Sequence, residues 1–166
     1  MKSYPRAFTL VELLLAVVIV TVLAMALFTN FSRSILKARF DDQVLAVTSL
    51  IEKARSYSLT NVLILDTEAP DYYLLTVTSA SVRLDAYGPT LDEELETVTL
   101  DNGFSISNIT GSEYAFYFPP EGDICFDTPD CASGVTEISF DIEDSAGTYS
   151  ETISIDAYGG YPQVGD

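Results

Sequence analysis

Two different spacings of apolar residues divide the first 60 positions of the chain. From Phe8 to Phe28 the residues are apolar almost without interruption, and Glu12 is the only charged residue in this run of 21. Farther along, residues recur at alternating steps of four and three and form a stripe: Leu36, Phe40, Val44, Val47, Ile51, Ala54 and Ser58. Neither Pro nor Gly occurs between Phe8 and Thr60, so we predict one unbroken helix, apolar all round in its first half and amphipathic in its second.

After Asn61 the apolar residues alternate with polar ones, which predicts β-strands. The predicted strands are 62–66, 72–78, 81–86, 97–100, 104–107, 114–118, 136–142 and 150–156. The segment from Gly88 to Glu96 is polar, and we predict a connector there with one helical turn at Leu91–Leu95. A helix followed by antiparallel strands indicates an α+β fold, with the amphipathic half of the helix packed on the sheet.

The apolar run from Phe8 to Phe28 has the length of a membrane-spanning helix, which needs about 20 residues. A charged side chain inside such a span costs about 2.5–3.5 kcal/mol on insertion scales, so Glu12 requires a partner. Lys2 and Arg6 precede the run, as basic residues do in secretory signal peptides, but the apolar core of those peptides has only about 7–15 residues. A plain membrane anchor and a cleaved signal peptide remain the alternatives.

The segment Ala7-Phe8-Thr9-Leu10-Val11-Glu12-Leu13 resembles the processing site of type IV pilin-like proteins, a family that includes the pseudopilins of type II secretion. The resemblance implies that a prepilin peptidase cleaves between Ala7 and Phe8 and N-methylates the new amino terminus. It also implies that Glu12 serves filament assembly. The family usually has Gly at the position of Ala7, and Ala is the nearest small substitute.

The resemblance also implies a domain organisation and a location. Residues 1–7 are the leader, 8–28 the transmembrane half of the helix, 29–60 its amphipathic half, and 61–166 an extracytoplasmic β-rich domain, in a pilin-like fold. The protein is expected in the cytoplasmic (inner) membrane as a single-pass protein with its N-terminus in the cytoplasm, and in a filament after assembly. The implied partners are other pilin or pseudopilin subunits, through their N-terminal helices, the prepilin peptidase and the inner-membrane assembly platform.

Charge is distributed very unevenly along the chain. Residues 1–60 hold seven of the eight Lys and Arg residues and four acids, whereas residues 61–166 hold Arg83 alone against 21 acids. The two parts therefore carry formal charges of +3 and −20, in agreement with the total of −17. Because nucleic-acid binding draws most of its affinity from Lys and Arg, this acidic domain is not expected to bind nucleic acid.

Three segments of the second half are similar to the pseudopilin H/FimT-like branch of the family: 116–122 with its Phe-x-Pro-x-Gly turn, 138–142 and 152–160. Some members of that branch bind DNA through a basic C-terminus. Here the tail from Gly160 to Asp166 contains no basic residue, so this activity is not carried over to the chain.

The two cysteines, Cys125 and Cys131, are separated by Pro and turn residues. Outside the cytoplasm such a pair is typical of a local disulfide, and two free thiols are the alternative. A zinc site is not expected, because the chain has no histidine and no second cysteine pair.

No catalytic site is predicted. Without histidine, a Ser-His-Asp or Cys-His arrangement cannot form, and the abundant carboxylates fit a solvated acidic surface better than a two-acid hydrolase. Four acids in one turn-rich segment could offer oxygen ligands to Ca²⁺, although they lack EF-hand spacing: Glu121, Asp123, Asp127 and Asp130. No other cofactor is expected.

Two hypotheses from different classes follow. The first is a structural filament subunit, a minor pilin or pseudopilin of a type IV pilus or type II secretion system. The second is a membrane-anchored extracytoplasmic binding module for Ca²⁺ or a surface ligand. The state of the mature N-terminus separates them, because only the first requires a chain that begins at N-methylated Phe8.

Overall fold

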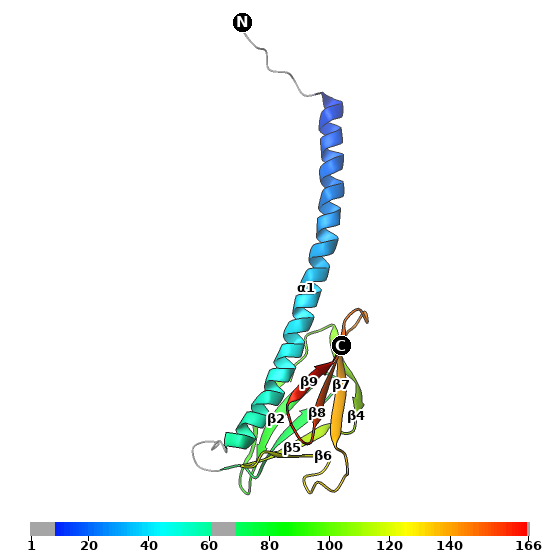
Figure 1. The fold of residues 1–166 in the computed structure, drawn as a ribbon. Helices are drawn as coiled ribbons and strands as arrows, with labels where there is room; N and C mark the ends of the chain where they lie inside the picture. Colours follow the sequence, from blue (N-terminus) through cyan, green and yellow to red (C-terminus); the bar gives the residue numbers. More distant parts are fainter. Residues whose placement is uncertain (1–8, 61–68, 166) are drawn as a thin grey trace. The chain divides into compact units, whose positions relative to one another are not determined.

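One long helix, α1 (Leu10–Thr60), is followed by nine strands in the part of the chain that the structure describes (Figure 1). This computed structural model describes residues 9–60 and 69–165, with the backbone alone for residues 26–30. The chain divides into two compact units between Arg39 and Phe40. The first contains the N-terminal part of α1, and the second contains the rest of α1 with all the described strands.

The described strands form two antiparallel sheets within the second unit. The five-stranded sheet has the order β3-β2-β1-β5-β6, and the four-stranded sheet has the order β4-β7-β8-β9. The strand bounds are β1 Tyr72–Val77, β2 Ser81–Tyr87, β3 Asp92–Thr99, β4 Phe104–Thr110, β5 Tyr114–Phe118, β6 Asp123–Phe126, β7 Glu137–Asp144, β8 Ser150–Asp156 and β9 Pro162–Gly165. The α+β fold predicted from the sequence, with the helix packed on antiparallel sheet, is confirmed.

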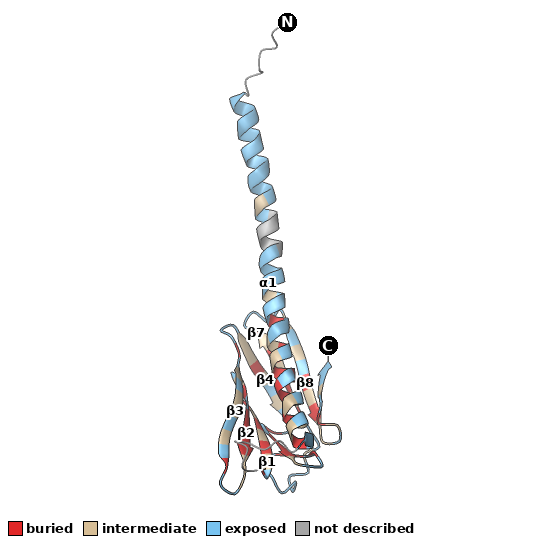
Figure 2. Ribbon diagram, turned by 90° about the vertical axis from the view of Figure 1, so that its left-hand side faces the viewer, coloured by how far each residue is buried: buried red, intermediate tan, exposed pale blue. Residues whose placement is uncertain are grey.

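The predicted stripe of α1 is the side that enters the core. Six of its seven members are buried and Leu36 is half-buried, as Figure 2 shows for the part of α1 that lies against the strands. Phe40, Val44, Val47, Ile51 and Ala54 of the stripe join one hydrophobic cluster with the inward side chains of both sheets. The cluster includes Leu75 and Leu84 of the larger sheet and Phe140 and Ile153 of the smaller. Each such side chain contributes about 1.5–3 kcal/mol when fully buried, so the helix is an integral layer of this domain.

Aromatic and polar contacts fix the helix to both sheets. The Phe40 ring lies 6.2 Å from that of Phe104 on β4, and Tyr57 lies 5.7 Å from Tyr73 on β1, measured between ring centroids. Lys53 forms an ion pair with Glu96 of β3. These contacts add geometric restraints to the apolar stripe.

The predicted connector between Gly88 and Glu96 is wrong. Strand β3 begins at Asp92, and no helical turn forms at Leu91–Leu95. Its residues Asp-Glu-Glu-Leu-Glu have low intrinsic strand preference, but pairing with β2 along its whole length imposes the extended conformation. An acidic edge strand of this kind also discourages pairing with other chains.

Two short strands, β6 and β9, are absent from the predictions, and β4 extends three residues beyond the predicted end at Ser107. Each short strand has four residues, too few to show a clear alternation, and each follows a turn beside a longer partner. The predicted strand 62–66 lies outside the described residues.

The turn between β7 and β8 is organised by the buried carboxylate of Asp144. Its Oδ1 atom accepts hydrogen bonds from the backbone N–H groups of Thr148 and Tyr149, both at 2.6 Å, and its Oδ2 atom accepts one from Ala146 at 3.2 Å. The Tyr149 bond above all, then those of Thr148 and Ala146, holds the pKa of Asp144 below its usual range, against the opposing effect of burial.

These bonds predict a pH dependence that is specific to Asp144. Because its pKa is lowered by folding, its stabilising contribution is complete above the unfolded value of 3.8 and is lost as the pH falls through the folded value. In thermal unfolding, Asp144→Asn is expected to melt below the wild type at pH 7, with the difference shrinking below pH 3.8. The control Glu143→Gln removes the same charge from the adjacent position and is expected to leave the melting temperature nearly unchanged. An Asp144→Asn difference that stays constant down to pH 2 would contradict this prediction.

Gly111, between β4 and β5, is expected to be far less tolerant of substitution than Gly147. Both have positive φ, +83° and +65°, so alanine costs roughly 1–2 kcal/mol in either place. At Gly111 an added Cβ atom would also lie 2.3 Å from the backbone oxygen of Glu137, whereas at Gly147 it would meet nothing within 4 Å. Gly111→Ala should therefore lower the free energy of unfolding by about 1–3 kcal/mol more than Gly147→Ala, measured by denaturant titration. Equal losses in the free energy of unfolding would show that the β7 backbone at Glu137 moves aside without cost, which would contradict this prediction.

Candidate functional site

Glu12 lies in the first turn of α1, directly after the helix begins. Its backbone N–H donates to the carbonyl oxygen of Thr9 at 3.1 Å and to the Thr9 side-chain oxygen at 3.3 Å. Thr9 is thus the N-terminal cap, and Glu12 occupies the third helical position, which is the sequence spacing of a capping box. A carboxylate in the first turn also interacts favourably with the helix dipole, by about 0.3–1 kcal/mol.

This local arrangement gives Glu12 a structural role in addition to the one predicted for it. The cap residue Thr9 did not emerge from the sequence reasoning, although the spacing Thr-x-x-Glu before an apolar run is a known signal for it. The carboxylate of Glu12 itself is exposed. The two capping bonds use the backbone N–H of Glu12 and leave its charged group available to another molecule.

Around Glu12 the helix exposes apolar side chains on every side. In the isolated chain the large apolar residues between Leu10 and Met25 are 48–77 % exposed. They are Leu10, Val11, Leu13, Leu14, Leu15, Val17, Val18, Ile19, Val20, Val22, Leu23 and Met25. A helix that is apolar all round is stable only where lipid or other protein covers it.

Within the part of the chain that the structure describes, no helix combines the length and the apolar character needed to cross a membrane.

The predicted processing positions, Ala7 and Phe8, lie outside the described residues. The residue next to them, Thr9, is described and precedes the helix. The cleavage position and the N-methylation of Phe8 therefore stay predictions from the sequence.

In the second unit, Cys125 and Cys131 form a disulfide. Cys125 is buried on β6, and Cys131 lies in the exposed loop that follows. Other bonds of the loop hold it to the end of β6, including the one that the Ser133 hydroxyl donates to the carbonyl oxygen of Phe126 at 2.7 Å. The disulfide therefore fastens a surface loop to an edge strand.

The four acids considered as Ca²⁺ ligands do not form a metal site in this structure. Glu121 precedes β6, Asp123 begins it, and Asp127 and Asp130 follow it; all four are exposed. Among the described residues, no group of three or more His, Cys, Asp or Glu side chains could hold a metal ion. The neighbouring Thr128 side chain and the Ala132 backbone N–H, which donates to Asp130 Oδ1 at 3.2 Å, hold the pKa of Asp130 below its usual range, so local groups already stabilise this carboxylate.

Comparison with protein families finds a match at the N-terminus. Residues 2–28 match the prokaryotic N-terminal methylation motif. The match covers the leader, the predicted cleavage position, Glu12 and the apolar run. Neither curated proteins nor solved structures show a significant match to this chain.

Proposed function

This chain carries the N-terminal methylation motif of the type IV pilin and pseudopilin superfamily, and from that premise we propose that it is a minor pilin or pseudopilin. Its function is structural: it forms part of a type IV pilus or type II secretion filament. The observation that carries the proposal is the first part of α1, which exposes apolar side chains on all sides around one carboxylate. Such a surface fits a helix that packs among similar helices.

Before assembly, the apolar run from Phe8 to Phe28 anchors the chain in the cytoplasmic membrane. The sequence supports this step through the length of the run and through Lys2 and Arg6, which favour a cytoplasmic N-terminus. Prepilin peptidase then cleaves after Ala7 and methylates the amine of Phe8. The inner-membrane assembly platform adds the processed subunit to the filament.

In the filament, the amine of Phe8 in one subunit pairs with the carboxylate of Glu12 in its neighbour. Either charge alone is costly in apolar surroundings, and pairing offsets much of that cost. In the membrane the Glu12 carboxylate of a subunit is unpaired, and assembly removes the energetic cost of leaving it so. The exposure of Glu12 on an otherwise apolar helix supports this mechanism.

The proposal predicts that the mature protein begins at N-methylated Phe8. Mass spectrometry of the protein from its native membrane should give a chain that lacks seven residues and carries one added methyl group. Ala7→Gly restores the usual family residue and should be processed at least as fast, measured by pulse–chase in the same cells. An intact Met1 in the wild type would instead indicate a simple anchor and the binding-module alternative.

Glu12→Gln is expected to block co-assembly while preserving the helix start. Glutamine can still serve in a capping box, but it has no charge to pair with an amine. The amount of variant recovered in sheared filaments, relative to the membrane fraction, should fall about tenfold or more, and Glu12→Ala should behave alike.

The control is Thr9→Ala, which removes the cap and keeps the carboxylate. This variant loses about 0.5–2 kcal/mol of helix stability and should still enter filaments. If Glu12→Gln assembles normally while Thr9→Ala does not, assembly requires the helix cap and not the charge of Glu12. The pairing mechanism is then wrong.

A further inference from the structure

The outer face of the five-stranded sheet gathers aromatic residues from three strands. In β1 and β2, residues that alternate with buried core positions lie on the face opposite the core. Tyr72 and Leu74 of β1 pair with Tyr87 and Asp85 of β2. Leu74 also pairs with Phe116 of β5. This register brings the rings together at one end of the face.

Four of these residues are in contact, and we call them the aromatic cluster: Tyr72, Tyr87, Phe116 and Phe118. The Tyr72 ring is central, with centroid distances of 5.3 Å to Tyr87, 5.5 Å to Phe116 and 5.9 Å to Phe118. Phe116 is buried, whereas the other three are half-buried. Part of the cluster is therefore accessible from solvent.

Four carboxylates border the cluster on the same face, and we call them the acid rim: Asp85, Asp92, Glu94 and Asp123. Asp92 pairs with Tyr87, and Asp123 pairs with Phe118, so each lies beside an aromatic ring. Glu94 on β3 pairs with Asp85. Asp92, Glu94 and Asp123 are exposed.

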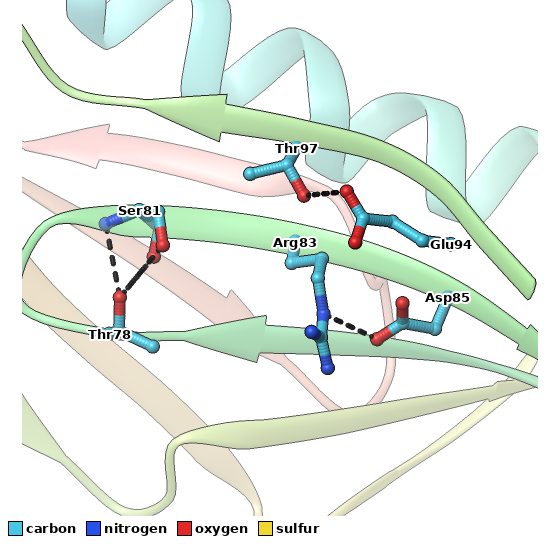
Figure 3. Close-up of polar contacts among 6 residues, drawn as sticks. All are labelled: Thr78, Ser81, Arg83, Asp85, Glu94 and Thr97. Atoms are coloured by element: carbon cyan, nitrogen blue, oxygen red, sulfur yellow. Dashed lines mark hydrogen bonds and ion pairs between the residues drawn. The ribbon is translucent and has the colours of Figure 1, made fainter.

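Asp85 is the one buried member of the acid rim, with a side chain 5 % exposed. The Arg83 Nε atom donates to its Oδ2 atom at 2.8 Å, and Figure 3 shows this pair on β2 next to Glu94 on β3. Burial raises the pKa of Asp85, and Glu94 and Asp92 add to the rise, whereas Arg83 opposes it. Burial likewise raises the pKa of Tyr87, with further contributions from Asp85 and Asp92. At Tyr87 the effects of the two carboxylates are each larger than that of Arg83, so the acid rim acts on the rings of the cluster with negative charge.

A cationic group fits this surface. The faces of aromatic rings attract ammonium and guanidinium groups, and the surrounding carboxylates add to that attraction. Arg83 is the only base after residue 60, and its Nε atom is already bonded to Asp85. The cation must therefore come from outside residues 61–166, and an anionic partner would be repelled.

The chain itself holds a matching segment in residues 31–39, which we call the basic segment. It contains Arg33, Lys37 and Arg39 and no acid, and all three bases are exposed. Within α1, residues four apart share a side of the helix, so Arg33 and Lys37 point the same way and Arg39 lies on another side.

We propose that the aromatic cluster and its acid rim bind the side of the basic segment that holds Arg33 and Lys37 in a second copy of this chain, with Arg33 facing the rings and Arg39 outside the contact. The inference rests on the proposed function, because filament assembly brings copies together. It adds a contact that involves neither Phe8 nor Glu12.

A charge exchange tests the proposal in the full-length protein. Two differently tagged copies are co-expressed in cells without the prepilin peptidase, extracted in mild detergent at low salt, and co-purified. Arg33→Glu in both copies, or Asp92→Arg in both, should reduce recovery of the second tag about tenfold. When one copy carries Arg33→Glu and the other Asp92→Arg, recovery should return to near the wild-type level, because both possible contacts between the two differently tagged copies then join opposite charges.

Matched controls separate this contact from general charge effects. Arg39→Glu makes the same charge change as Arg33→Glu on a different side of the helix. Glu113→Arg makes a change of the same size as Asp92→Arg at an exposed position between β4 and β5. Both controls should retain association within about twofold, and thermal unfolding should show that all variants are folded.

Two results would overturn the inference: failure of the mixed Arg33→Glu and Asp92→Arg copies to associate, or equal loss with the controls. Because the cells lack the peptidase, neither result depends on processing. The proposed function fails independently, through an unprocessed Met1 in normal cells or normal assembly of Glu12→Gln. If the mixed copies associate but one of these two tests of the proposed function fails, the contact between copies is supported and the filament mechanism is not.

Discussion

The apolar stripe on the second half of α1 is the constraint on which the domain depends. Both sheets bury their inner faces in a cluster that includes this stripe, so the side of the helix that faces inward determines which side chains fill the core. A shift of one residue turns a helix by about 100° and would replace Val47 and Ile51 with Thr48 and Glu52. Burying Glu52 in that core would cost several kcal/mol, which fixes the helix register.

The same helix meets a different requirement before Arg39. Between Leu10 and Met25 apolar residues surround the helix, so no choice of side removes them from water. Leucine, valine and isoleucine pack equally well in a protein core, in lipid and in a helical bundle. The carboxylate of Glu12 is favourable only where the surroundings offer a partner for its charge. Thr9 and the backbone of Glu12 stabilise the helix start from within the chain, and the Glu12 carboxylate stays exposed.

The elements with regular periods could be predicted from the sequence, whereas their pairing could not. The stripe and the longer alternating strands follow from side-chain spacing, because spacing directly reports which side is buried. Strand β3 has a composition that argues against a strand, and only pairing with β2 makes it one. The aromatic cluster depends on register: Tyr72, Tyr87 and Phe116 are distant in sequence, and nothing in their local patterns shows that they meet.

The candidate site divides in the same way. Glu12 stands out in the sequence because a charge inside an apolar run is conspicuous, and its neighbour Thr9 follows a recognisable capping pattern. The burial of Asp85 could not be anticipated, since Asp85 occurs among the many acids of the domain and only its pairing with Arg83 and the neighbouring strands sets it apart.

Charge finally limits how copies of this chain can be arranged. Two domains of formal charge −20 repel one another at close range, and salt screens that repulsion only beyond a Debye length of about 8 Å. When copies lie with their acidic domains side by side, this repulsion therefore offsets much of the free energy that packing of the apolar helices contributes. An arrangement shifted so that the basic segment of one copy meets the acidic domain of the next replaces repulsion with attraction at the same separation. The uneven charge along the sequence thus favours neighbouring copies that are shifted along the helix axis over copies that lie level with one another.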